Sequence, residues 1–172
     1  MHRINKIDYF VGAFLTTILN SSKGVPAIFD DTESNKRVEF STDTGDFNVY
    51  IKYSTKVRKA RTSINGKRKS KFSWNIAFTE SEYKVLRDSF KKEDRENLLC
   101  LVCTNEKFYP TYMAGLSYED ALKCLENSTG SGSRKIVVTR IGREHDFYCY
   151  GVGFNKEDYI KCPVDGAKFL VV

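Results

Sequence analysis

The alternation of apolar and polar residues predicts short strands interrupted by three amphipathic helices. Apolar residues recur every three or four positions between Asn5 and Ser21, which is the spacing of a helix with one buried face. Two further helices are predicted after Thr79 and Ser117, because each is followed three residues later by an acid, as in a capping box. Strands are predicted at 37–41, 48–53, 72–78, 98–103, 135–141 and 146–152, with a last strand in the tail, 155–172.

This order, αβββαβ followed by αββ, predicts an α+β (mixed α/β) fold with a central, mainly antiparallel sheet and flanking helices. The segments 37–41, 48–53 and 72–78 are expected to form an antiparallel meander. A chain of 172 residues favours a single domain. Within it, residues 1–103 would form the αβββαβ core and 104–172 an αββ extension. Apolar residues make up 41% of the chain, which is enough to form a buried core.

Positive charge is concentrated in one segment. Nine Lys or Arg residues and no acid lie between Lys52 and Lys71, whereas the rest of the chain has 19 basic and 22 acidic residues. Grouped cations attract nucleic acid because they neutralise phosphates and release counterions. Alternatively, a charged hairpin tip keeps a protein soluble and prevents edge-to-edge strand pairing. We predict a basic loop with a turn at Asn65-Gly66, and its candidate nucleic-acid contacts are Lys56, Arg58, Lys59, Arg61, Lys67, Arg68, Lys69 and Lys71.

Aromatic residues border this basic segment. Tyr50, Tyr53 and Trp74 lie on the strands that flank it, and nucleic-acid bases stack on aromatic side chains. The alternative is that these rings belong to the core. We favour the core for Trp74, and the pattern leaves both interpretations open for Tyr50.

The cysteines and the first apolar run indicate a cytoplasmic protein without a membrane partner. Five cysteines form no dense framework, which favours free thiols in a reducing compartment. Cys100 and Cys103 are three residues apart in a predicted strand, so their side chains point to opposite faces and are expected to be buried rather than to share a zinc ion. The apolar run 9–19 is too short to cross a bilayer and predicts a core helix.

The order helix, three strands, helix and buried strand, together with the tripeptide Tyr50-Ile51-Lys52, resembles the PD-(D/E)xK nuclease superfamily with its restriction-endonuclease-like fold. The resemblance implies that Lys52 is the family's lysine and that Glu39 is its first metal-binding acid. Tyr50 occupies the position of the second acid, for which Asp46 would substitute. The resemblance also implies Mg²⁺ as the cofactor and a role in DNA processing or defence.

Three functions therefore compete. The first is nucleic-acid binding through the basic segment 52–71, to DNA or RNA. The second is a Mg²⁺-dependent endonuclease with Glu39, Asp46 and Lys52 as catalytic residues and Glu39 and Asp46 as metal ligands. The third is a protein-interaction or adaptor domain whose basic segment meets an acidic partner. Because Tyr50 is not an acid, binding is favoured over cleavage, and enzymatic activity stays open.

Overall fold

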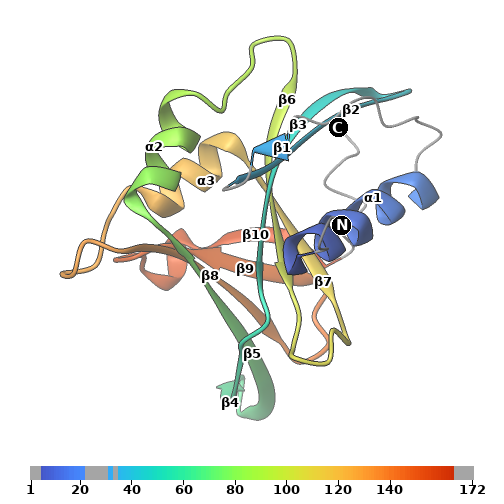
Figure 1. Ribbon diagram of the computed structural model, residues 1–172. Helices are drawn as coiled ribbons and strands as arrows, with labels where there is room; N and C mark the ends of the chain where they lie inside the picture. Colours follow the sequence, from blue (N-terminus) through green and yellow to red (C-terminus); the bar gives the residue numbers. More distant parts are fainter. Residues whose placement is uncertain (1–4, 22–30, 33–34, 165–172) are drawn as a thin grey trace.

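The computed structural model describes residues 5–21, 31–32 and 35–164, which form helices packed against two five-stranded sheets (Figure 1). The first sheet has the order β1-β2-β3-β6-β7 and the second the order β10-β9-β8-β5-β4. All strand pairs are antiparallel except β3 with β6. The predicted α+β fold class is confirmed.

The first sheet is covered on both faces. Its strands are β1 (Asp31–Thr32), β2 (Asn35–Thr42), β3 (Gly45–Ser54), β6 (Glu96–Cys103) and β7 (Tyr112–Ser117). Helix α1 (Lys6–Ser21) lies against one face, where Phe10 and Phe14 pack with Val49 and Ile51 of β3. These residues form one core cluster, beneath α1. Tyr50 points to the opposite face of the sheet and belongs to the second core cluster, which lies between the two sheets. Burial on both faces explains the near-continuous apolar run of β6.

The second sheet closes the other side of that core. Its strands are β4 (Val57–Ile64), β5 (Lys67–Phe78), β8 (Arg134–Ile141), β9 (Asp146–Tyr150) and β10 (Ile160–Pro163). The second cluster joins Leu99 and Leu101 of the first sheet to Ile76 and Val138 of the second. The same cluster includes residues of α2 (Glu80–Asp88) and α3 (Tyr118–Leu125), and a short 3-10 helix, η1 (Lys156–Asp158), precedes β10.

The caps predicted from the sequence are present. The Thr79 hydroxyl accepts a hydrogen bond from the Glu82 amide at 3.2 Å, and the Glu82 carboxylate accepts one from the Thr79 amide at 2.8 Å. At the start of α3, the Ser117 hydroxyl accepts from the Asp120 amide at 3.1 Å. Each contact satisfies an amide that the first helical turn leaves without a backbone partner.

The antiparallel meander predicted for 37–41, 48–53 and 72–78 is wrong. β2 and β3 do pair, but the other side of β3 pairs with β6, and β5 lies in the other sheet. The chain crosses between the sheets at Thr55 and Lys56, and both sheets take strands from before and after residue 103. Strand β7 was also missed, whereas a strand in the tail was predicted and is β10; residues 165–172 lie outside the described part.

The cysteines are all free, as the sequence predicted, and all five are buried. Cys100 belongs to the core beneath α1 and Cys103 to the core between the sheets, so the two thiols do lie on opposite faces of β6. Trp74 belongs to the core, as expected, and so does Tyr50, which the sequence left open. Within the described ranges, no helix combines the length and the apolar character needed to cross a membrane.

Candidate nucleic-acid interface

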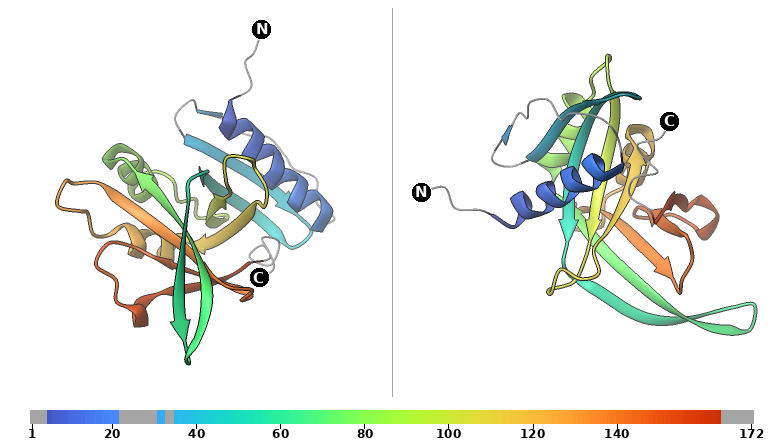
Figure 2. Two further views of the ribbon diagram at one scale, coloured as in Figure 1. Left: turned by 90° about the horizontal axis from the view of Figure 1, so that it is seen from below. Right: turned by 90° about the vertical axis from the view of Figure 1, so that its right-hand side faces the viewer.

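The basic segment is a pair of strands rather than a loop. Val57 to Ile64 of β4 pair antiparallel with Lys67 to Trp74 of β5, and Asn65-Gly66 connect them with φ angles of 50° and 74°. Positive φ at both positions is what a two-residue hairpin turn requires, and Asn-Gly adopts it readily. We call residues 57–71 the arm. Figure 2 shows that the arm extends well beyond the body of the molecule.

The register of the arm divides its cations between two faces. Residues opposite one another in an antiparallel pair share a face, and neighbours along a strand alternate. We call the face that contains Val57 and Trp74 the pocket face, for a cavity described below. The arm cations on this face are Lys59, Arg61 and Arg68. Those on the reverse face are Arg58, Lys67, Lys69 and Lys71, and Lys56 precedes β4.

Most of this charge has no acidic counterpart. Lys69 forms an ion pair with Glu144 at 2.9 Å, and this contact lowers the pKa of the Glu144 carboxyl below its ordinary value. Among the described residues, the other seven candidate contacts form no ion pair. Five of the arm's cations are exposed, namely Arg58, Lys59, Arg61, Lys67 and Arg68. The arm is therefore an uncompensated positive surface, which attracts polyanions.

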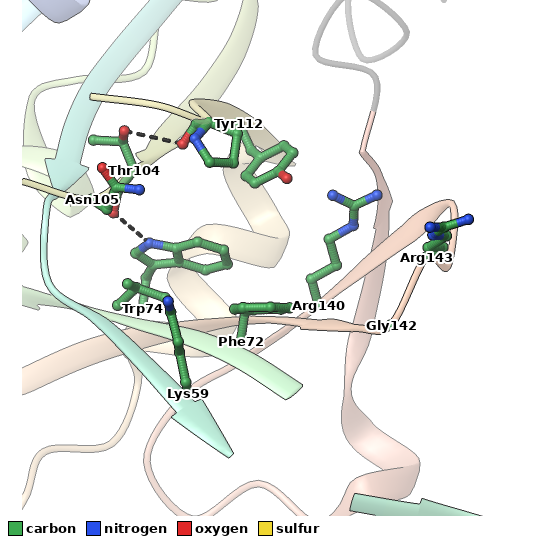
Figure 3. A pocket seen from close by; sticks show the side chains of 11 residues that line it. Lys59, Phe72, Trp74, Thr104, Asn105, Tyr112, Arg140, Gly142 and Arg143 are labelled. Carbon is green, nitrogen blue, oxygen red and sulfur yellow. Dashed lines mark hydrogen bonds between the residues drawn. The ribbon is translucent and has the colours of Figure 1, made fainter. Parts of the chain in front are cut away.

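A cavity lies at the foot of the arm, on the pocket face (Figure 3). Its volume is about 320 Å³, within the range of roughly 300–1,000 Å³ that is typical of ligand sites. Strands β4, β5, β7 and β8 contribute to it, together with the loop after β6 and the β8–β9 turn. The lining residues are Val57, Lys59, Phe72, Trp74, Thr104, Asn105, Pro110, Tyr112, Arg140, Gly142 and Arg143.

The walls of this cavity are aromatic and held by hydrogen bonds. The Trp74 indole N–H donates to the Thr104 carbonyl at 2.7 Å, which fixes the ring, and the Thr104 hydroxyl donates to the Pro110 carbonyl at 3.1 Å. The Arg140 guanidinium lies over the Tyr112 ring, 4.8 Å from its centroid. Arg140 Nε is buried and has no hydrogen-bond partner in the described part of the chain. The cavity thus combines flat apolar walls with the positive charge of Arg140.

Lys52 is a half-buried residue of β3 and does not belong to the arm. Its ammonium group donates to the Glu82 carboxylate at 2.7 Å and to the Ala77 carbonyl, and it lies 4.5 Å from the centroid of the Phe78 ring. Glu82 is also the capping residue of α2. Lys52 therefore joins the first sheet to the end of β5 and the start of α2, which is a structural role.

The residues of the predicted nuclease site are not brought together. Asp46 and Lys52 are six residues apart on β3, a separation of about 20 Å along a strand. Glu39 lies opposite Asn48, which is four residues from Lys52. The Glu39 carboxylate forms ion pairs with Lys92 and Arg95. Asp46 is exposed near the start of β3. The three side chains cannot act on one metal ion or one phosphate from these positions.

Tyr50, at the position of the missing acid, is buried in the core between the sheets. Its ring is 1% exposed and packs against Phe78 and Phe90, with centroids 6.5 Å and 5.7 Å away. Burial is the main reason that its pKa is raised above the ordinary value. A phenol in a nonpolar core does not replace a metal-binding carboxylate. Throughout the described residues, no three His, Cys, Asp or Glu side chains are grouped in a way that could hold a metal ion.

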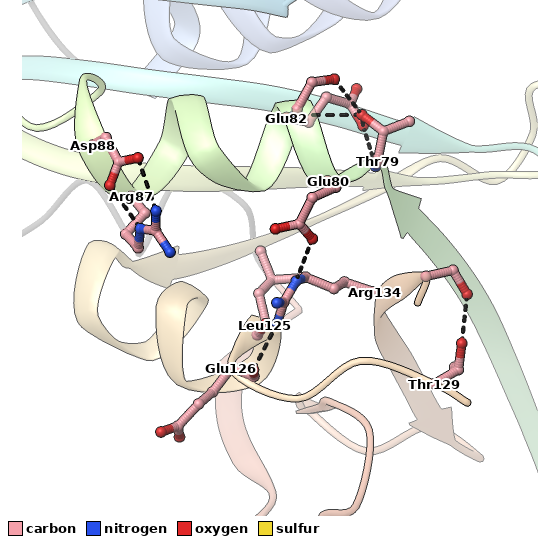
Figure 4. A network of polar contacts seen from close by, with 11 residues as sticks. Thr79, Glu80, Glu82, Arg87, Asp88, Leu125, Glu126, Thr129 and Arg134 are labelled. Carbon is pink, nitrogen blue, oxygen red and sulfur yellow. Dashed lines mark hydrogen bonds and ion pairs between the residues drawn. The ribbon is translucent and has the colours of Figure 1, made fainter. Parts of the chain in front are cut away.

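A second polar cluster surrounds Arg134 at the start of β8 (Figure 4). Its guanidinium binds Glu80 of α2 at 3.1 Å and the carbonyls of Leu125 and Glu126 at the end of α3. The same guanidinium lies 3.9 Å from the centroid of the Tyr83 ring. Because these groups satisfy one another, the cluster fastens α2 and α3 to the second sheet and offers little to a ligand.

Comparisons with protein-family models, curated proteins and solved structures found no match to this chain.

The eight nucleic-acid contacts predicted from charge lie together on the arm or at its root. The cavity was not predicted, because its lining comes from four separate stretches of sequence. The pair Thr104-Asn105 directly after a buried strand, and Arg140 and Arg143 near a predicted turn, were the only local signals. Neither signal shows that these residues meet Trp74.

Proposed function

We propose that the protein binds nucleic acid and that the arm is its main contact surface. The observation that carries this proposal is the uncompensated charge of the arm: seven of its 15 residues are Lys or Arg, none is Asp or Glu, and only Lys69 has an ion-pair partner among the described residues. Cations arranged along a narrow projecting element match the linear charge of a phosphate backbone.

The strand pairing of the arm supports the same function. Two-stranded ribbons are among the elements that enter the major groove of duplex DNA, and basic grooves follow single strands. The hydrogen-bonded register holds the cations at fixed spacing, so less conformational entropy is lost on binding than from a flexible loop. The arm's charge also fits an acidic protein, which is the alternative that the experiment must separate.

The experiment measures fluorescence polarisation of labelled single- and double-stranded DNA and RNA over a salt series, with and without Mg²⁺. The test variant replaces Lys59, Arg61, Lys67 and Arg68, four exposed cations of the arm, by Gln. The control variant removes the same charge from exposed positions elsewhere, by replacing Lys84, Lys91, Lys123 and Lys156 by Gln.

We expect binding that weakens steeply with salt, is lost in the arm variant and persists in the control variant. Equal losses in both variants would show that net charge alone attracts the oligonucleotides, and the arm assignment would be wrong. If no oligonucleotide binds at low salt, nucleic-acid binding is refuted and an acidic protein partner becomes the function to test.

A further inference from the structure

The cavity at the foot of the arm has the composition of a nucleotide site. Phe72, Trp74 and Tyr112 provide flat apolar surfaces, with the Trp74 and Tyr112 ring centroids 6.0 Å apart. Lys59, Arg140 and Arg143 provide positive charge at the same cavity. Nucleobases stack on aromatic rings and phosphates bind guanidinium groups, so one nucleotide would use both kinds of surface.

Arg140 supplies an independent indication of an anionic ligand. Its Nε atom is buried without a partner, and leaving a buried charged donor unsatisfied is costly. Figure 3 shows the guanidinium between Tyr112 and Arg143 at the edge of the cavity. A phosphate placed there would meet the positive charge of the Arg140 guanidinium and that of Arg143.

The position of the cavity connects it to the arm. Phe72 lies directly opposite Lys59 on the pocket face, and Arg140 lies opposite Phe72 on the next strand. A second hollow of about 530 Å³ shares Val57, Lys59 and Asn105 with the cavity. It is also lined by Thr55, Lys56, Glu106 and Lys107. A nucleic-acid strand lying along the pocket face of the arm would pass these positions, whose net charge is positive despite Glu106.

We infer that this cavity receives one unpaired nucleotide, with its base against Phe72, Trp74 and Tyr112 and its phosphate at Arg140. This inference rests on the proposed function, because the strand on the arm is the expected source of that nucleotide. A free mononucleotide carries the same chemistry, so the experiment must distinguish the two sources. In duplex DNA the bases are paired and stacked, so the cavity favours single strands, loops and ends.

Trp74 makes the inference directly measurable. It is the one tryptophan of the chain, so fluorescence excited at a wavelength that tyrosine does not absorb reports on this residue of the cavity wall. Titration with a single-stranded oligonucleotide is expected to change this fluorescence, whereas an oligonucleotide of abasic sites, with the same phosphates but no bases, is not. Free AMP and UMP test the mononucleotide source, with ribose 5-phosphate as the probe that lacks a base.

Two variants remove one positive charge each from strands of the second sheet, β8 and β4. Arg140→Gln removes the guanidinium from the cavity, and Arg58→Gln removes one from the reverse face of the arm. We expect Arg140→Gln to weaken single-strand binding by about tenfold more than Arg58→Gln, in line with the loss of one charge-assisted hydrogen bond to a phosphate. Because Arg140 packs on Tyr112, Arg143→Gln at an exposed cavity residue serves as a second variant that should not disturb folding.

The site of contact can be located by photo-crosslinking a 5-iodouracil oligonucleotide, followed by peptide mapping. Crosslinks to Phe72, Trp74 or Tyr112 would support the inference. One outcome would overturn the inference and leave the proposed function standing. In that outcome binding is salt-sensitive, Trp74 fluorescence does not change, and Arg140→Gln and Arg143→Gln each reduce the affinity for the oligonucleotide no more than Arg58→Gln does. If no oligonucleotide binds but AMP or UMP changes Trp74 fluorescence, the arm proposal fails and the cavity takes free nucleotides. If neither oligonucleotides nor mononucleotides bind, the proposed function and the cavity inference are both wrong.

Discussion

The division of the arm's cations into two faces gives a quantitative prediction. One triple variant replaces Lys59, Arg61 and Arg68 on the pocket face by Gln, and the other replaces Arg58, Lys67 and Lys71 on the reverse face. Each variant lowers the net charge by three, none of the six side chains has an ion-pair partner among the described residues, and both faces belong to the same strand pair. A difference between the variants therefore reports on where the ligand lies.

The magnitude follows from counterion release. Each lost phosphate contact on a single strand flattens the slope of log K against log salt by about 0.7, so three lost contacts flatten it by about 2. Between ~50 and ~200 mM salt, this slope change corresponds to about a 20-fold smaller loss of affinity than in the wild type. We expect this effect in the pocket-face variant and a slope within about 0.7 of the wild type in the reverse-face variant.

The assay is polarisation of a labelled single-stranded oligonucleotide at five or more salt concentrations, with each variant's melting temperature measured in parallel. If the salt slope of the reverse-face variant flattens as much as that of the pocket-face variant, the oligonucleotide contacts both faces of the arm. A larger loss in the reverse-face variant would refute the placement of the ligand on the pocket face.

Three further predictions test the fold around the proposed interface. Tyr50→Asp restores the acid of the nuclease pattern but buries a carboxylate in the core, so the unfolding free energy measured in urea should fall by about 3–5 kcal/mol. A stable variant that cleaves DNA with Mg²⁺ would contradict this structural role of Tyr50. Gly151→Ala places a methyl group 1.8 Å from the Cys124 carbonyl oxygen and should lower the unfolding free energy by about 1–3 kcal/mol, whereas Gly12→Ala, with open space in α1, should raise it by about 0.5–1 kcal/mol. Burial raises the pKa of the Cys124 thiol to about 12, so iodoacetamide at mildly alkaline pH should not label Cys124 in the native protein. All five cysteines should react in urea, and rapid native labelling of Cys124 would show that the core opens.

The sequence predicted the parts of the fold that depend on local pattern. The apolar stripe of α1, the Thr79–Glu82 capping box and the Asn65-Gly66 turn all depend on residues within a few positions of one another, and all three are present. The sharing of strands between two sheets was not predicted. Both sides of β3 are occupied by β2 and β6, which lie 10 and about 50 residues away in the chain, and no local pattern encodes this choice.

Strand β4 was missed because its sequence has no apolar face. Strand prediction relies on alternation between a buried and an exposed side, and Val57 to Ile64 alternate between two solvated sides. Charge density groups the eight candidate contacts without any knowledge of pairing, and the structure places them on the arm or next to it. The division of these contacts into two faces depends on register, which only the structure provides.

The register also explains why binding and stability should be separable in this protein. Pairing between β5 and β8 begins at Lys71, and residues 58–70 contribute no side chain to either core cluster. These residues are held by the pairing of β4 with β5, by the Lys69–Glu144 ion pair and by the hydrogen bond that the Gly142 amide donates to the Ser70 carbonyl. Substitutions at Arg61 or Arg68 should therefore change affinity without changing the melting temperature. Phe72 and Trp74 belong to the arm's root and to the core between the sheets, so substitutions there should change both. Substitutions on the arm should therefore reduce binding without lowering the melting temperature. The cavity can be tested in the same way through Arg143 and Lys59, whose exposed side chains lie at its rim.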